Sequence, residues 1–244
     1  MQSVSEIIDL GKWTEASLDK LLRSASAIPD AGERVAFLSE RFLGTPYGAH
    51  TLAGGPGRHE AFVVNLRTVD CFTFIDYVEA LRHSSSFRDL KENLRRVRYR
   101  SGVVHYETRN HFFSDWREQN SGLVEDVTEG IAPGGCVRVL KELNRRSDGS
   151  PFVPGIPLKR REITLVPRGA LDGEALARLW NGDYVGVCST DEGLDVSHVG
   201  IIIRGPQAVL LRHASSREGT GVVLDEELLT YIAGVPGLTV LRPS

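Results

Sequence analysis

Residues 61–81 read AFVVNLRTVDCFTFIDYVEAL, and this stretch decides the fold. Its first six residues are mainly apolar, which is typical of a buried strand. After residue 70 the pattern changes to helical spacing, and one face gathers the apolar side chains of Phe74, Ile75, Val78 and Leu81. An aspartate that precedes a helix caps the free N–H groups of the first turn, so Asp70 predicts a helix that begins beside Cys71.

Outward from this stretch, helices are expected mainly early in the chain and strands late. The expected helices cover 14–28, 30–42, 86–97 and about 171–180. The expected late strands cover 162–167, 183–188, 198–203 and 208–213. Helices followed by antiparallel strands predict an α+β fold.

We expect one elaborated domain over residues 1–244. It would comprise a helical N-terminal part at about 1–44, the cysteine-bearing helix at about 70–83 and a histidine-bearing sheet at about 160–225. Residues 147–161 are rich in Ser, Pro and Gly and predict a long surface connection. Such a connection could divide the core into two lobes.

The composition is that of a folded globular protein, with 41% hydrophobic residues, 25% charged residues and a net charge of -3. This balance gives no electrostatic reason to bind nucleic acid or an anionic membrane, so no nucleic-acid partner is expected. No apolar run reaches the roughly 20 residues of a transmembrane helix, and the first residues lack a signal pattern. We expect a soluble protein, periplasmic or in the cell envelope if an export signal was trimmed and otherwise cytoplasmic. The oligomeric state stays open.

The three cysteines have different sequence contexts. Cys71 lies at an expected helix start, where unpaired N–H groups and the positive end of the helix dipole stabilise a thiolate. The same N–H groups could hold the oxyanion that forms when a thiolate attacks an amide. Cys136 also lies near an expected helix start, so position alone leaves both open as nucleophile or as a small buried residue. Cys188 lies in an expected strand, where a core role is favoured.

Cysteine and histidine also bind zinc, but the sequence contains neither His-Glu-x-x-His nor Cys-x-x-Cys. His105 and His111 stand six residues apart without a supporting ligand pattern. We therefore expect no metal and no other cofactor.

Two of the seven histidines have a predicted spatial relation. Gly205-Pro206 reads as a two-residue hairpin turn between two strands. In that register Arg204 pairs with Gln207 and His198 lies directly opposite His213, with Cβ atoms about 4.5–5.5 Å apart. One imidazole could then fix the tautomer of the other, as a base and its orienting partner require.

Several segments, in order along the chain, resemble the NlpC-type cell-wall hydrolases, which are papain-like cysteine enzymes. Leu43–Tyr47 followed by Gly54-Gly55 resembles that family's Gly-x-Pro-Tyr…Gly-Gly segment, and Val69–Phe74 resembles its nucleophile motif. Asn181–Val185 followed by Ser197–Ile201 resembles its Gly-Asp-Leu-Val…His-Val-Gly-Ile segment.

Three features resemble one subfamily more narrowly. The nucleophile motif reads Asp-Cys-Phe-Thr-Phe, where the wider family usually has Asp-Cys-Ser-Gly-Phe. Together with Arg109–Trp116 and Arg212–Ser215, it is similar to the N-acetylmuramoyl-L-alanine amidase-like subfamily, formerly a domain of unknown function. The resemblance covers roughly residues 43–216 and favours Cys71 over Cys136 as nucleophile.

The resemblance implies a fold and a set of roles. The fold is an NlpC-type, papain-like core whose cysteine-bearing helix packs on an antiparallel sheet, with additional N-terminal helices and insertions. Cys71 is implied as nucleophile, His198 as general base and later acid, and His213 as the orienting partner. Substrate contacts are implied for Tyr47, Asp70, Arg109, Asn110, His111, Asp115 and Trp116.

The implied activity is hydrolysis of peptidoglycan fragments (muropeptides) at the amide between N-acetylmuramic acid and L-alanine, through a thioester acyl-enzyme. The alternatives are an endopeptidase that cuts γ-D-glutamyl-diamino acid bonds in stem peptides, an acyltransferase, and a non-catalytic cell-wall-binding module. The set of Cys71, His198 and His213 argues against a binding module, which needs no catalytic groups. The sequence leaves the glycan form and the stem-peptide length open.

Overall fold

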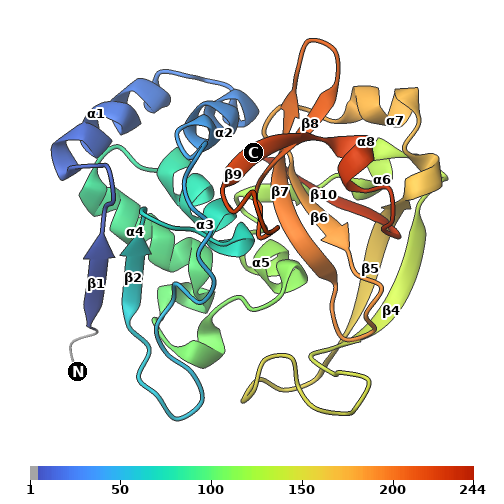
Figure 1. The fold of residues 1–244 in the computed structure, drawn as a ribbon, viewed down its shortest axis with the longest axis horizontal. Helices are drawn as coiled ribbons and strands as arrows, with labels where there is room; N and C mark the ends of the chain where they lie inside the picture. The colour runs from blue at the N-terminus through green and yellow to red at the C-terminus, as the bar shows by residue number, and fades with distance from the viewer. Residues whose placement is uncertain (1–4) are drawn as a thin grey trace. The chain divides into compact units, whose positions relative to one another are not determined.

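The structure, a computed structural model, describes residues 5–244 and divides the chain into two compact units (Figure 1). Unit 1 comprises residues 5–110 together with His213–Leu224, and unit 2 comprises His111–Arg212 together with Asp225–Ser244. The first four residues of the expected helical part at 1–44 lie outside the described residues. That both units act as one domain stays a prediction.

Unit 1 is mainly helical. Its helices are α1 (Glu15–Ser26), α2 (Ala31–Glu40), α3 (Cys71–Arg82) and α4 (Phe87–Arg98), with short 3-10 turns η1 (Arg100–Gly102) and η2 (Tyr106–Thr108). Helix α3 contacts α1, α2 and α4. Strands β1 (Glu6–Asp9) and β2 (Phe62–Asn65) pair in parallel, and β1 has no counterpart among the expected strands. The helices expected from periodicity in this part of the chain are confirmed.

The start of α3 is fixed by the cap that the sequence predicts. Asp70 Oδ1 accepts a hydrogen bond from the Thr73 backbone N–H at 2.7 Å, and the Asp70 N–H donates to Thr73 Oγ1 at 2.9 Å. This reciprocal pair satisfies two backbone donors that a helix start otherwise leaves free. Further along, buried Arg98 of α4 pairs with Asp76 of α3 at 2.8 Å and donates to the carbonyl of Val63 in β2 at 2.7 Å. Two helices and a strand are thereby joined through one guanidinium.

Unit 2 is built around a sheet. Its helical elements are α5 (Phe113–Gln119), α6 (Thr128–Ile131), η3 (Arg168–Ala170), α7 (Gly173–Arg178) and α8 (Leu228–Tyr231). The strands are β3 (Val124–Asp126), β4 (Val137–Leu143), β5 (Lys159–Pro167), β6 (Tyr184–Cys188), β7 (Val196–Arg204), β8 (Val209–Ala214), β9 (Val223–Glu227) and β10 (Gly237–Pro243). The sheet has the order β4-β5-β10-β6-β7-β8-β9, with β3 paired to β10. Helices with an antiparallel sheet confirm the α+β class, since β4 to β7 and β10 pair antiparallel. The last two residues of β8 and the first two of β9 belong to unit 1.

The two faces of the sheet in unit 2 are covered by different helices. Val185 and Val187 of β6 belong to a hydrophobic cluster with residues of α6, α7 and α8. The alternate residues of β6 point the other way, as the strand period of two requires. There the Tyr184 ring lies 5.4 Å from the Trp116 ring of α5. Gly186 lies directly under Phe113, so that the β6 backbone and the ring are in close contact.

Two details differ from the expectations, and strand β4 has no counterpart among the expected strands. Cys136 lies directly before strand β4 and not near a helix start. Residues 147–158 form a largely exposed connection inside unit 2 and residues 159–161 begin β5, so the segment 147–161 does not divide two lobes. In β4, Lys141 points inward and Leu140 outward, because the Lys141 ammonium reaches two backbone carbonyls.

Among residues 5–244, no helix combines the length and the apolar character needed to cross a bilayer.

The hairpin between β7 and β8 is shifted from the expected register. Arg204 pairs with Val209 and not with Gln207, and the Gly205 N–H donates to the Ala208 carbonyl at 2.9 Å. The two central residues of the turn are therefore Pro206 and Gln207. Proline prefers the first central position of a turn because its ring fixes φ.

This shift means that His198 and His213 are not directly opposite each other, as the sequence had predicted. The pairing moves by two residues, and a shift of two keeps each side chain on its face of the sheet. Along β7, alternation places His198 on the same face as Ile202. Along β8, it places His213 on the same face as Leu211, the residue paired with Ile202. The prediction that the two histidines lie directly opposite each other is wrong. The side of the sheet to which each histidine points agrees with the alternation along its strand.

Gly186→Ala should destabilise the protein by about 1–3 kcal/mol, because overpacking of a filled core costs this much. The added Cβ would lie 2.6 Å from both Phe113 Cδ1 and Val196 Cγ1. Gly122→Ala is the matched control, since its Cβ would meet no atom within 4 Å. Urea unfolding of the three proteins gives the free energies. Equal stability of the Gly186 variant and the control would show that Phe113 does not pack as described.

Candidate active site

The start of helix α3 is held beside the segment that contains Tyr47. Tyr47 and Val69 form a parallel bridge. The Val69 N–H donates to the Pro46 carbonyl at 3.1 Å, and the Gly48 N–H donates to the Val69 carbonyl at 3.0 Å. Because Val69 is followed by Asp70 and Cys71, these bonds bring two of the predicted motifs together within unit 1.

The other edge of the same segment pairs with residues near the end of the chain. The Tyr47 N–H donates to the Gly221 carbonyl at 2.8 Å, and Pro46 bridges with Val222. Val222 in turn accepts a hydrogen bond from the Ser215 N–H at 2.9 Å. Backbone pairing thus runs from the nucleophile motif through Tyr47 to the segment that follows His213. Nothing in the sequence pattern marked residues 221–223 as part of this arrangement.

Cys71 is the first residue of the twelve-residue helix α3 and is partly exposed. The positive end of the helix dipole favours a negative charge at this place. Burial raises the pKa of the Tyr47 hydroxyl, and the neighbouring Cys71 and Asp70 raise it further. Tyr47 therefore stays protonated at neutral pH and could donate a hydrogen bond at this end of α3.

The other two thiols lie in less favourable surroundings for a thiolate. Cys136 donates to the carbonyls of Thr128 and Ala132 at 3.4 and 3.5 Å, and burial followed by the charge of Glu129 raises its pKa. Cys188 is buried in β6, and burial raises its pKa to about 11. Of the three cysteines, only Cys71 combines a helix N-terminus with partial exposure.

His198 lies on β7 in unit 2, opposite Val187 and next to a bulge between Val187 and Cys188. It is partly exposed, and its ring centroid lies 5.6 Å from that of Tyr231 in α8. His213 is 1% exposed near the end of β8 and belongs to unit 1. The aromatic neighbour Tyr231 was missed by the sequence, because only the folded sheet brings α8 to β7.

Asp195 connects the strand of His198 to helix α5. Its carboxylate accepts from the Ser114 N–H at 2.7 Å and from the Val196 N–H at 2.8 Å. Its carbonyl accepts from the Ser189 N–H at 3.1 Å. Burial raises the pKa of Asp195 above its usual range. The motif around Ser114 and the strand that carries His198 are therefore joined through one buried carboxyl group, which the sequence did not single out.

The segment predicted to contact substrate is divided between the two units. Arg109 pairs with buried Glu60 at 3.3 Å and lies over the Tyr106 ring. Asn110 is buried and donates to the Val97 carbonyl at 2.9 Å, which attaches it to the end of α4. Both residues are thus engaged by unit 1.

The remaining members of the segment lie in unit 2. Asp115 pairs with Arg161 and Lys159 at 2.6 and 2.7 Å. Trp116 has no exposed surface and stacks on Phe113, so direct contact with a substrate is not expected of it. His111 is partly exposed at the approach to α5. Asp115 and Trp116 therefore make separate contacts within unit 2, and that they contact substrate stays a prediction.

Within the described part of the chain, no group of three or more His, Cys, Asp or Glu side chains could hold a metal ion. The chemistry available to the residues above is that of a thiol at a helix start together with imidazole groups. Such groups catalyse acyl transfer when a base lies within reach of the thiol.

Comparison with solved structures finds similar proteins over most of the chain. A Legionella pneumophila protein designated DUF1460 has a TM-score of 0.79 at 22% identity, with 94% of each chain covered, and supports the fold alone. An N-acetylmuramoyl-L-alanine amidase from Bacteroides uniformis has a TM-score of 0.75 at 26% identity, covering 88% of this chain and 99% of that one. A Bacteroides fragilis protein named as a candidate xylanase has a TM-score of 0.71 at 30% identity, covering 84% and 98%.

No curated protein matches the chain in sequence. A family model does match, over residues 37–238, and this range includes Tyr47, Cys71, His198 and His213. It describes AmiA-like proteins, which are N-acetylmuramoyl-L-alanine amidase-like. The range covers most of the 244 residues. The chain therefore belongs to the N-acetylmuramoyl-L-alanine amidase-like family and is an amidase-like enzyme.

Proposed function

We propose that the protein hydrolyses the amide between N-acetylmuramic acid and L-alanine in peptidoglycan fragments, with Cys71 as nucleophile. The observation that carries the proposal is the placement of Cys71 at the capped start of α3, beside Tyr47. Family membership and the Bacteroides uniformis amidase support the bond that is cleaved. The proposed fold type is NlpC-type and papain-like, with α3 packed on the sheet.

In the proposed mechanism His198 accepts the thiol proton of Cys71. The sulfur then bonds to the lactyl carbonyl carbon, and the N–H groups of the first turn of α3 hold the oxyanion. As the carbon–nitrogen bond breaks, His198 returns the proton to the leaving amine of L-alanine. Water that is deprotonated by His198 then attacks the thioester, releasing the muramic acid carboxylate and the Cys71 thiol.

Three further residues have proposed supporting roles. His213 orients the His198 ring and fixes its tautomer, which a neighbouring hydrogen-bonding group can do even when it is not directly opposite. Tyr47 donates a hydrogen bond to the oxyanion or to the substrate. Asp70 caps α3 and holds the first turn in place for the oxyanion.

Substrate contacts are proposed for Arg109, His111 and Asp115, whose side chains retain some exposure. Asn110 and Trp116 are assigned instead to positioning the same segment, since both are buried. Contacts on the sugar and on the peptide would make both halves of a muropeptide necessary for fast reaction, because remote binding energy is used at the reacting centre.

Cys71→Ala should abolish hydrolysis of a muramoyl-tripeptide while the protein stays folded, because the chemistry requires a thiolate. Cys136→Ala is the matched control and should keep wild-type activity.

Iodoacetamide near neutral pH should label Cys71 faster than Cys136 or Cys188, since a helix start favours the thiolate and burial raises the pKa of both other thiols. Peptide mass mapping measures the labelling. Faster labelling of Cys136, or activity in the Cys71 variant, would contradict the assignment.

His198→Ala should reduce kcat nearly as far as loss of the thiol, since general base catalysis alone contributes about 10²–10⁴-fold. His213→Asn should keep partial activity, because an amide can still hold the base. Steady-state kinetics with circular dichroism as a folding control measures both variants. If His213→Asn were as inactive as His198→Ala, His213 would have to do more than orient the base, and the proposed orienting role would be wrong.

The products of a muramoyl-tripeptide should be an intact tripeptide and a peptide-free sugar, and the free tripeptide should react poorly because half of its contacts are missing. Mass spectrometry identifies the products, and xylan serves as a control polysaccharide. Release of L-alanyl-γ-D-glutamate would indicate an endopeptidase. Shortened xylan would support the activity for which the Bacteroides fragilis protein is named. Absence of turnover with intact binding would indicate a cell-wall-binding module.

A further inference from the structure

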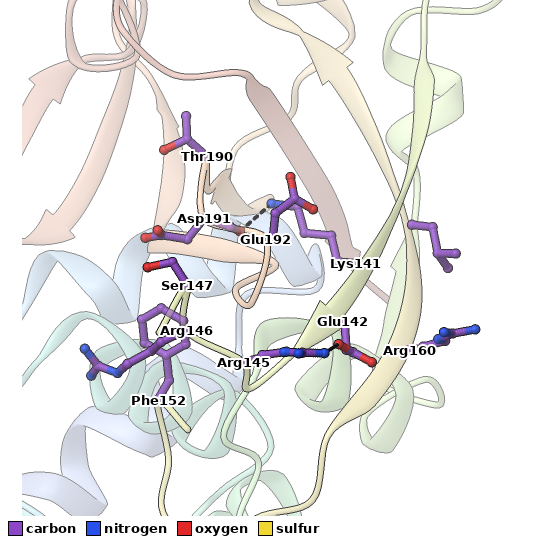
Figure 2. Close-up of a pocket in the computed structure, with 11 residues that line it drawn as sticks. Lys141, Glu142, Arg145, Arg146, Ser147, Phe152, Arg160, Thr190, Asp191 and Glu192 are labelled. Carbon is purple, nitrogen blue, oxygen red and sulfur yellow. Dashed lines mark hydrogen bonds and ion pairs between the residues drawn. The ribbon is translucent and has the colours of Figure 1, made fainter. Parts of the chain in front are cut away.

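A hollow of about 650 Å³ lies in unit 2, outside every segment that the proposed function uses (Figure 2). One wall consists of strand β4 with the loop that follows it, and the other consists of residues 190–192. A volume of this order accommodates a small ligand or a short peptide segment. All of its lining residues belong to one unit.

The loop after β4 is held in one shape by Asn144. This residue is fully buried and has a φ of 75°, in the left-handed region that asparagine tolerates better than most residues. Its side-chain amide donates to the carbonyls of Val153 and Ile156 at 3.0 and 2.7 Å and accepts from the Val153 N–H at 2.6 Å. With the side chain bonded on both sides, this wall is formed before any ligand arrives.

The loop on the opposite wall, which contains residues 190–192, is also held by buried hydrogen bonds. Buried Lys141 donates to the carbonyls of Ser189 and Asp191, both at 2.7 Å, so its charge is used inside the protein. A Cβ at Gly193 would lie 2.0 Å from the Arg145 carbonyl oxygen, so the two loops pack backbone against backbone. Both walls are therefore fixed relative to each other within unit 2.

The two walls carry opposite excess charge. On the β4 side, Arg145 is paired with Glu142 at 2.7 Å, while Arg146 lies over the Phe152 ring at 4.5 Å. Figure 2 shows Arg145 and Arg160 on either side of Glu142. Within residues 5–244, neither Arg146 nor Arg160 forms an ion pair.

On the opposite wall, Asp191 and Glu192 are exposed. Neither carboxylate forms an ion pair with any residue that the structure describes. Among the described residues, the hollow thus has a guanidinium without an ion pair, that of Arg146, on one side and two carboxylates without an ion pair on the other.

We propose that this hollow is a second binding site, which takes a zwitterionic peptide. The peptide carboxylate would lie toward Arg146, beside the Phe152 ring, and its ammonium toward Asp191 and Glu192. Guanidinium and carboxylate form strong charge-assisted hydrogen bonds. A polyanion would meet the two carboxylates and a polycation the arginines, so like-charge repulsion excludes both. None of its lining residues has a role in the proposed hydrolysis, so the second site goes beyond that function.

The test is a titration of ¹⁵N-labelled wild-type protein followed by NMR. The probes are L-alanyl-γ-D-glutamyl-L-lysine, the α-linked Ala-Glu-Lys, and the first peptide with its amino groups acetylated and its carboxyl groups amidated. Saturable shifts should gather at residues 140–147 and 190–192, and the blocked peptide should bind at least about fivefold more weakly. Tighter binding of the γ-linked peptide would identify a cell-wall stem peptide as the source. Equal binding of the two free peptides would indicate peptides in general.

Charge-removing variants separate this site from the proposed active site. Arg146→Ala and Asp191→Asn should each weaken probe binding about threefold, and the double variant about tenfold, because one exposed ion pair contributes little. Arg138→Ala removes an exposed arginine of β4 outside the hollow and should change nothing. Hydrolysis of the muramoyl-tripeptide should be unchanged in all four proteins. Wild-type affinity in the double variant, shifts confined to other residues, or no saturation would overturn the second site, whatever the outcome for hydrolysis.

Discussion

The arrangement of unit 1 depends on one short run of backbone, residues 44–47, whose two edges are both hydrogen-bonded. One edge pairs with Val69, directly before the cysteine helix, and the other with Gly221–Val223. Backbone bonds are insensitive to side-chain identity, so the position of this segment beside the helix start does not depend on the Tyr47 side chain. The main chain holds the segment in place, and the Asp70 side chain caps the helix that begins beside it.

Unit 2 uses a different device for the same purpose. Buried Asp195 accepts backbone N–H groups from α5 and β7 and so holds the start of a helix against the strand of His198. Burying a carboxyl group is costly unless its oxygens are hydrogen-bonded, and here both accept donors of the backbone. In the same helix, Phe113 packs on Gly186 and Trp116 packs on Tyr184. Apolar contacts and hydrogen bonds therefore both hold α5 against the sheet.

Local features of the fold were predictable from the sequence, and features that depend on distant partners were not. The cap of α3 involves residues three positions apart, and the sequence pattern indicated α1 to α4, α7 and five of the ten strands within residues 5–244. Strand β4 was not expected, because its inward residue is Lys141 and its outward residue is Leu140, the reverse of the usual pattern. The hairpin register failed at Pro206, whose fixed φ selects the first central position of the turn. The burial of Trp116 was not predictable either, because it depends on Tyr184, which is distant in the sequence.

The pairing of Pro46 with Val222 also has a consequence for the order in which the protein can be completed. A ribosome releases the helices of unit 1 early, yet residues 221–223, the edge partner of residues 44–47, emerge only after all of residues 48–220. Contacts between residues so far apart in sequence form late and slow the folding of a domain. The surroundings of Cys71 are therefore complete only after residues 221–223 have been synthesised. A nascent or C-terminally shortened chain carries the thiol without the backbone frame that positions it.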